Sequence, residues 1–112
     1  MRLFPVLCII ATQTFADAPV VQNVLISGDS VSVSLSHPDT GWDHYADGWE
    51  VLDADGNSLG VRVLFHPHVT EQPFTRSLSG VQIPQGANAV YIRARCNVDG
   101  WSDALFEVRI GD

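Results

Sequence analysis

The chain has 112 residues, enough for one compact domain. It carries 13 acidic residues against six basic ones, all arginine, and its formal net charge is −7 at pH 7. This balance argues against proteins that bind nucleic acid or anionic membrane surfaces, because no basic patch is available to meet phosphates. It suits a soluble protein or one that meets a cationic partner.

The beginning of the chain is typical of a secretory signal peptide. Arg2 supplies a positive charge, an apolar run follows over residues 3–11, and small residues stand at Ala16 and Ala18. The apolar run is much shorter than the roughly 20 residues that a membrane-spanning helix needs.

We therefore predict that residues 1–16 are a signal peptide, cleaved after Ala16 or after Ala18, and that residues 17–112 form a single domain. The mature chain would be secreted or periplasmic, and we do not expect it to insert into a membrane. Cys96 would then be its only cysteine, so no intrachain disulfide is expected.

Apolar and polar residues alternate through the rest of the chain, and turn residues recur about every ten positions. This pattern predicts an all-β sandwich or barrel. Seven strands are expected near residues 20–26, 31–35, 49–52, 61–65, 75–83, 90–96 and 105–110. The predicted core is made of Val31, Val33, Leu35, Trp49, Val51, Val61, Val63, Leu78, Val90, Ile92 and Ala94.

Three stretches resemble the fibronectin type III family: SVSVSLSHP, GWEVLDADGNSLG and VQIPQGANAVYIRARCNVDGWSD. The similarity covers about residues 19–110. It lies in a serine-rich strand that runs into a proline, a hairpin that carries an aromatic residue, and an arginine-rich strand followed by Asn-x-x-Gly-Trp-Ser. The resemblance implies a seven-stranded antiparallel sandwich of two sheets, related to the immunoglobulin-like folds.

The strand order that this resemblance implies brings three long loops to one end of the sandwich. These B–C, C′–E and F–G loops follow the second, fourth and sixth predicted strands. All four histidines and two of the three tryptophans of the chain fall at this end. Loops on a rigid scaffold commonly carry binding sites.

The sequence His66-Pro67-His68 indicates one candidate metal site. Residues i and i+2 of an extended segment point the same way, about 7 Å apart, so two imidazoles can converge on one ion. His44, His37 or Glu71 would supply a further ligand. Such ligands suit zinc or copper(II). The alternative is a proline-stiffened turn with two solvated imidazoles.

Cys96 ends the sixth predicted strand, where alternation turns it inward beside Ile92 and Ala94. We expect a buried and unreactive thiol, although an exposed one would favour copper(I) or zinc. On the outer face of the same strand, Arg93 and Arg95 are expected to pair with Glu50 and other acids of the third strand.

Aromatic residues indicate a second kind of site at the loop end. Trp42, Tyr45 and Trp101, with Asp99 beside them, could form a platform for a protein or a glycan. The alternative is that one or two of these rings only cap the end of the sandwich.

Taken together, these features favour a non-catalytic recognition module. We do not expect an enzyme, because the chain has neither a nucleophile in a strand-to-helix turn nor a glycine-rich phosphate loop, and a small sandwich offers little concave volume. The first alternative function is a periplasmic zinc- or copper-binding protein. The second is a small subunit held by strand addition at an edge of a sheet.

Overall fold

The computed structural model of the protein describes residues 18–110, so the predicted signal peptide lies outside the described residues. Within residues 18–110 the structure is all-β and contains no helix. Its strands are β1 (Val20–Ser27), β2 (Ser30–Ser36), β3 (Ala46–Leu52), β4 (Ser58–Val63), β5 (Phe74–Leu78), β6 (Ala89–Cys96), β7 (Gly100–Trp101) and β8 (Phe106–Arg109).

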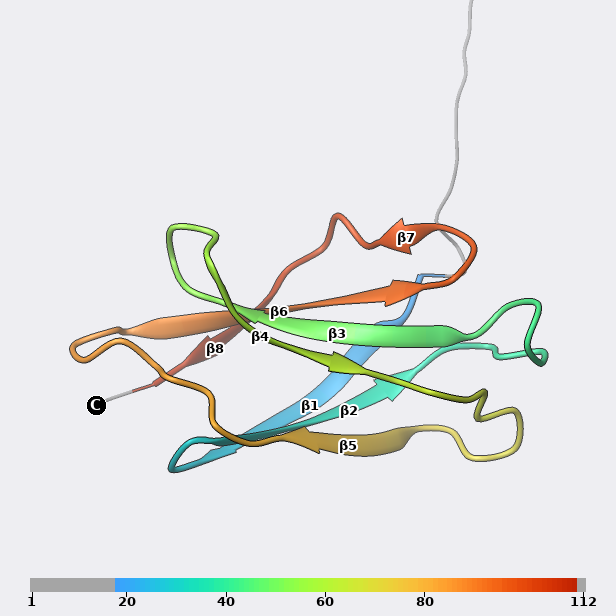
Figure 1. Cartoon of the computed structure of the whole chain (residues 1–112), viewed down its shortest axis with the longest axis horizontal. Helices are drawn as coiled ribbons and strands as arrows, with labels where there is room; N and C mark the ends of the chain where they lie inside the picture. The colour runs from blue at the N-terminus through green and yellow to red at the C-terminus, as the bar shows by residue number, and fades with distance from the viewer. Residues whose placement is uncertain (1–17, 111–112) are drawn as a thin grey trace, which may run out of the picture.

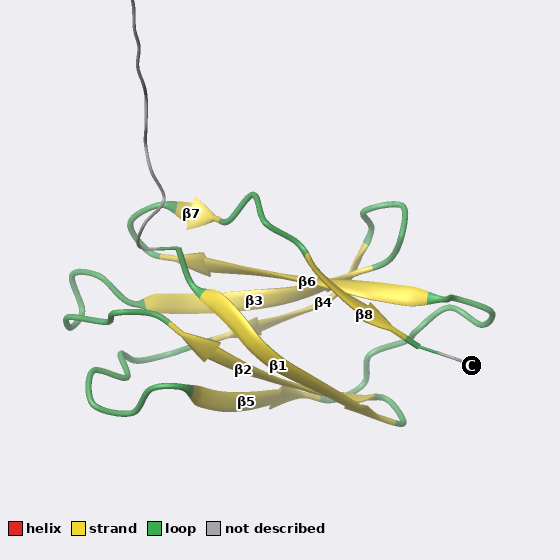
Figure 2. Ribbon diagram, turned by 180° about the vertical axis from the view of Figure 1, so that it is seen from behind, coloured by secondary structure: helices red, strands yellow, loops and turns green. Residues whose placement is uncertain are grey.

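The strands form two antiparallel sheets, as predicted. One sheet has the order β1-β2-β5, and the other has the order β4-β3-β6-β7, with β8 also paired to β6. Figure 2 shows the first sheet lying across the second. Eight strands are found in the described residues where seven were expected, because the last segment pairs with β6 in two separate pieces, β7 and β8.

Strict alternation builds the core between the sheets. Val31, Val33 and Leu35 of β2 are at most 1% exposed, while the serines between them hydrogen-bond to β5 on the outer face. The buried cluster is completed by Ala46, Trp49 and Val51 of β3, by Val90, Ile92 and Ala94 of β6, and by Leu64, Phe74 and Val81. Burial of these apolar side chains is the main stabilising contribution to the fold.

The prediction for β4 was wrong in one respect: Val61 and Val63 are 44% and 47% exposed. A bulge interrupts the pairing of β3 with β4 between Val51 and Leu52. In the resulting register, Arg62 lies opposite the buried Trp49, and Gly60 lies opposite the buried Val51. Because side chains alternate between faces, the two valines point outward.

The reason for this register is the close approach of the two sheets at β4 and β5. A Cβ atom on Gly60 would lie 2.8 Å from Cδ2 of Leu78. Nearby, Nε of Arg62 donates to the backbone carbonyl of Ser77 at 2.8 Å. Gly60 also has a φ of +156°, which favours a glycine at this position. The long arginine reaches across from one sheet to the other.

The fifth strand ends earlier than predicted, at Leu78, and Leu78 itself is only partly buried. Gly80 has a φ of +76°, which turns the chain out of the sheet. The backbone N–H of Val81 then donates to the carbonyl of Asp29 at 2.9 Å, and the Val81 side chain is 2% exposed. This segment thus contributes to the core without being part of a strand.

The connections alternate between the two ends of the sandwich (Figure 1). Residues 37–45, 64–73 and 97–99 lie together at one end, called here the loop end. This arrangement is the one expected from the sequence. In residues 18–110, the structure contains no helix long and apolar enough to span a membrane.

Candidate functional site

The carboxylate of Asp39 fixes the architecture of the loop end. Its Oδ1 accepts hydrogen bonds from Nδ1 of His37 at 2.6 Å and from the backbone N–H of Ala46 at 3.0 Å, and its Oδ2 accepts one from the backbone N–H of His68 at 2.8 Å. Asp39 is 6% exposed, and a buried carboxylate needs such donors to offset its desolvation. The loops 37–45 and 64–73 are thereby joined.

The same contacts define the state of the His37 ring. Because Asp39 acts as an acceptor for two backbone N–H groups, we assign the imidazole proton to Nδ1, where it donates to Oδ1. In the neutral imidazole, the other ring nitrogen, Nε2, carries a lone pair. This atom is buried, and no atom of residues 18–110 is within hydrogen-bonding reach of it.

His37 faces two further metal-binding side chains, His44 and Cys96. One potential ligand atom from each of the three residues lies within 4.8 Å of the others. The rings of His37 and His44 meet edge to face with centroids 4.8 Å apart, and Nε2 of His44 is 3.5 Å from Sγ of Cys96. His37 and Cys96 are buried and His44 is partly exposed, so the cluster can be reached from the His44 side.

The sulfur of Cys96 is buried, as predicted, but its surroundings are polar. The backbone N–H of Asp99 donates to Sγ at 3.3 Å, and Oδ2 of Asp99 is 3.8 Å away. In the second of these contacts the Cys96 S–H is the donor and the carboxylate accepts. Cys96 is therefore a buried sulfur with polar contacts, and its lack of reactivity stays a prediction.

The histidines of the His-Pro-His segment lie near each other, with ring centroids 4.6 Å apart. His68, however, stacks on Phe74 at 3.8 Å, and its Nε2 accepts a hydrogen bond from Arg76 at 2.8 Å. Glu71 also pairs with Arg76, at 3.8 Å. A guanidinium thus occupies the position where these two side chains would bind a cation.

In the described part of the chain, the predicted set of His44, His66, His68 and Glu71 does not form a converging group, whereas His37, His44 and Cys96 do. Burial, followed by the charge of Arg76, lowers the pKa of His68 below its ordinary value of 6.5. His68 is therefore held neutral as part of the packing at the base of the loop.

The aromatic residues of the loop end are divided between two places. Trp42 and Tyr45 meet edge to face with centroids 5.6 Å apart. The side chain of Asn97 holds their loop in place by accepting the N–H of Tyr45 at 2.9 Å and donating to the carbonyl of Trp42 at 3.0 Å. The Trp42 side chain is 66% exposed.

Trp101 packs elsewhere, under two arginines on the outer face of the sheet. The guanidinium carbons of Arg93 and Arg95 lie 4.4 Å and 5.3 Å from the centre of its ring. As predicted, Arg93 pairs with Glu50 at 2.7 Å, and Arg95 pairs with Asp47 at 2.9 Å. Cation–π contacts and ion pairs therefore form one network, in which Glu50 is buried and the two arginines are partly exposed.

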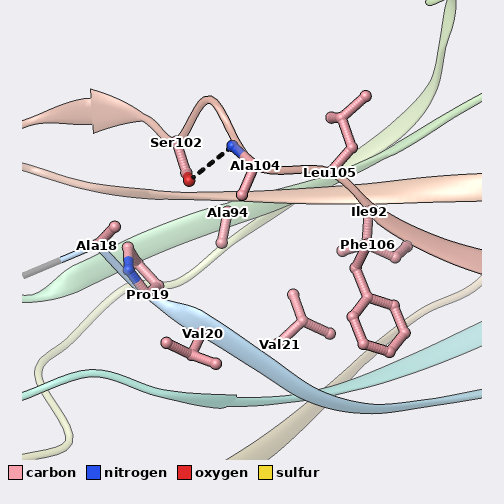
Figure 3. Close-up of a pocket in the computed structure, with 10 residues that line it drawn as sticks. All are labelled: Ala18, Pro19, Val20, Val21, Ile92, Ala94, Ser102, Ala104, Leu105 and Phe106. Atoms are coloured by element: carbon pink, nitrogen blue, oxygen red, sulfur yellow. Dashed lines mark hydrogen bonds between the residues drawn. The ribbon is translucent and has the colours of Figure 1, made fainter. Parts of the chain in front are cut away.

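An apolar cavity of about 300 Å³ lies apart from the loop residues discussed above, between β1 and the segment that joins β7 to β8 (Figure 3). It is lined by Ala18, Pro19, Val20, Val21, Ile92, Ala94, Ser102, Ala104, Leu105 and Phe106. The Ser102 hydroxyl in its wall accepts the N–H of Ala104 at 3.2 Å. With no titratable side chain in its lining, this cavity offers no acid–base chemistry.

Sequence reasoning gave too little weight to His37-Pro38-Asp39. Its signal was the i, i+2 spacing of an imidazole and a carboxylate around a proline, the same spacing that drew attention to His66 and His68. The position of Cys96 at the end of a strand pointed to the same end of the molecule, but its approach to His44 depends on the pairing of β3 with β6.

No protein-family model matches the chain. Over 70 residues it is 43% identical to a protein of Halomicrobium mukohataei named "Putative lipoprotein"; the match covers 62% of this chain and 34% of that protein. The chain thus spans about a third of the relative's length.

Among solved structures, the chain is similar to a hypothetical protein from Pyrococcus horikoshii OT3. The TM-score is 0.49 and the sequence identity is 20%, over 91% of this chain and 96% of the other.

Proposed function

We propose that the protein is a non-catalytic recognition module that binds a protein partner through its loop end. The observation that carries this proposal is the exposure of large apolar side chains on loops that a rigid scaffold holds together. Trp42 and Phe65 are 66% and 72% exposed, and Val69 and Val98 are 53% and 60% exposed. These four residues come from all three loops of that end.

The apolar surface continues from the loop end onto an edge of the sandwich. Val61 and Val63 on the outer side of β4 lead directly to Phe65. Large exposed aromatic residues surrounded by aliphatic ones are typical of protein interfaces. The edge-to-face arrangement of Trp42 and Tyr45 also favours a shaped protein surface over a flat sugar ring.

Charge gives the partner a further property. Asp43, Glu71 and Asp99 are exposed on the three loops, while Arg76 is paired with Glu71 and Arg95 with Asp47. Complementary charge steers association and sets specificity. The partner surface would therefore combine an apolar patch with lysine or arginine residues.

We further propose that the module acts outside the cytoplasm and is a divergent member of the fibronectin type III family. The location is supported by the predicted signal peptide together with a relative that bears the name of a lipoprotein. The family is supported by the quoted motifs and by the division of the strands into β1-β2-β5 and β4-β3-β6 with β7 and β8.

The test is a comparison of two matched surface variants. Trp42→Ala combined with Phe65→Ala removes the exposed aromatic residues of the loop end, and Leu25→Ala removes an equally exposed side chain of β1, 65% exposed. Envelope and secreted proteins of the source cell are captured on immobilised protein and identified by mass spectrometry. Binding of the isolated partner is then measured by calorimetry.

The proposal expects a partner that the wild type and Leu25→Ala bind equally and that the double variant binds at least tenfold more weakly, on the scale of an interface hot spot. Equal binding by all three proteins would contradict it. Binding of the same surface to a glycan array, with no protein captured, would assign the site to a sugar ligand.

A further inference from the structure

We propose that His37, His44 and Cys96 form a binding site for a zinc or copper ion beneath the loop end. The site differs from the ligand set that the His-Pro-His segment suggested, with which it shares His44. His37 and Cys96 are buried, whereas Trp42 of the proposed recognition surface is exposed.

The first argument is the orphaned nitrogen of His37. An imidazole that is 3% exposed, with one nitrogen bonded to a carboxylate and the other without a partner, leaves a buried lone pair unsatisfied. Leaving such a buried acceptor unpaired destabilises the folded state. A metal ion satisfies it, and the hydrogen bond from Nδ1 to Asp39 is the outer contact that metal-bound histidines usually make.

The second argument is the chemistry of the three donors. Two imidazoles and a thiolate are soft to intermediate ligands, which zinc and copper prefer. Magnesium and calcium prefer oxygen ligands instead. As the metal binds, the Cys96 thiol releases its proton to solvent, and the thiolate lone pair forms the bond to the metal. The N–H of Asp99 already points at this sulfur.

The third argument is distance. Ligand atoms around a tetrahedral zinc ion stand about 3–4 Å apart. Nε2 of His44 and Sγ of Cys96 already have this spacing at 3.5 Å, and the whole set lies within 4.8 Å. His44 is partly exposed, which leaves its side chain room to adjust, while the hydrogen bond to Asp39 holds His37 in place.

The fourth coordination position is open toward Asp99. Its Oδ2 lies 3.8 Å from Sγ of Cys96, and the side chain is exposed and free to rotate. With this carboxylate bound, a thiolate and a carboxylate neutralise a divalent ion. The ion would then join loop 37–45 to loop 97–99, which stiffens the surface that carries Trp42.

The experiment uses the full chain with Cys8→Ser, so that Cys96 is the only thiol. The protein is stripped with a chelator and titrated with Co²⁺, the spectroscopic substitute for zinc. The variants are Cys96→Ser, His44→Gln and His37→Gln, with His66→Ala as the matched control on a neighbouring loop. Circular dichroism identifies the variants that fold.

We expect one Co²⁺ per chain, with a sulfur-to-metal charge-transfer band and the visible bands of a tetrahedral ion. Cys96→Ser should abolish the charge-transfer band. His44→Gln should weaken binding at least tenfold, since even the loss of an outer contact costs about 10–100-fold. His66→Ala should bind like the parent. Zinc or copper(I) added to the cobalt-loaded protein should then remove the bands.

The proposal is overturned if the parent shows no thiolate charge-transfer band, if His44→Gln binds as well as the parent, or if neither zinc nor copper(I) displaces cobalt. Should His37→Gln fail to fold, His44→Gln still decides the matter, because His44 is partly exposed and its ring is not bonded to Asp39.

Discussion

At the scale of single residues, Asp39 has the greatest influence on the loop end. It joins the ring of His37, the start of β3 at Ala46 and the backbone of His68 through three hydrogen bonds. These donors come from positions up to 29 residues away in the sequence. Removing the charge should therefore loosen both loops at once, whether or not a ligand is bound.

Asp39→Asn should lower the free energy of unfolding by about 1.5–3 kcal/mol, the range for hydrogen bonds to a charged group. The reason is that the side-chain amide nitrogen of asparagine is itself a donor. It would face one of the three donors that bind the Asp39 carboxylate in the wild type. Urea denaturation at pH 7.5 measures the loss. Asp43→Asn, an exposed neighbour on the same loop, is the control and should change stability by less than about 0.5 kcal/mol.

Because of His68, the free energy of unfolding should be lower in acid than at neutral pH. Burial and the Arg76 charge lower its pKa in the folded protein below 6.5, so the unfolded chain takes up a proton first as the pH falls. The free energy of unfolding should decrease as the pH falls through 6.5 and level off for this group below the folded-state pKa. Above 6.5 both states are neutral and the effect vanishes.

Denaturant unfolding of the wild type and of His68→Gln at a series of pH values between about 8 and 5 tests this linkage. Glutamine cannot be protonated in this range, and its oxygen can accept the hydrogen bond from Arg76. The variant should show a smaller dependence of stability on pH. Identical dependence in both proteins would assign the acid sensitivity to other groups.

At the scale of strands, β4 and β6 look alike in sequence but differ in how they are buried. Both alternate apolar with polar residues, yet Ile92 of β6 is 0% exposed whereas Val61 of β4 is 44% exposed. β6 lies inside its sheet between β3 and β8, and its apolar face has the other sheet above it. β4 is an edge strand, and the bulge near Leu52 turns its valines outward.

This contrast gives a paired prediction on stability. Ile92→Ala should cost about 2–5 kcal/mol, because it removes buried methyl groups and leaves a cavity. Val61→Ala should change the free energy of unfolding by less than about 1 kcal/mol, as for surface positions. Equilibrium denaturation of both variants checks the result. Comparable losses at the two positions would mean that the inward and outward faces of β4 are assigned wrongly.

At the scale of the whole molecule, the two sheets share a core, and a polar contact joins the edge strand β4 of one sheet to the edge strand β5 of the other. Arg62 extends from β4 to the carbonyl of Ser77 in β5, and its second nitrogen donates to the carbonyl of Val63 at 2.7 Å. It thereby satisfies an acceptor on the open edge of the smaller sheet. A covered edge is also protected against pairing with other chains.

Arg62→Met should lower the free energy of unfolding by about 0.5–1.5 kcal/mol, since it keeps the apolar stem but loses the hydrogen bonds. Amide exchange of β5 should also become faster, because its edge is freed. Hydrogen exchange and urea denaturation measure the two effects. Arg109→Met is the control: that side chain is 78% exposed, makes an ion pair at 3.6 Å, and should contribute little.

The sequence by itself determined the class of fold and most strand positions, and its resemblance to a known family predicted that three long loops, two of them with histidines, lie at one end. The fold class and the strand positions follow from local information. Alternation with period two marks a half-buried strand, and glycine and proline mark where each strand turns. The inward positions of β2 and β6 could be predicted because apolar and polar residues alternate regularly along both strands. Neither strand contains an extra residue that would break this alternation.

Only the tertiary structure decided which side chains meet. His44 and Cys96 are 52 residues apart, and their approach depends on the register between β3 and β6. The outward turn of β4 depends on a single bulge, which shifts every later side chain to the other face. Arg76 likewise reached His68 and Glu71 through packing that no local pattern encodes. The metal-binding candidates therefore changed from His66 and His68 to His37 and Cys96, because convergence of side chains is a property of paired strands and not of spacing along one of them.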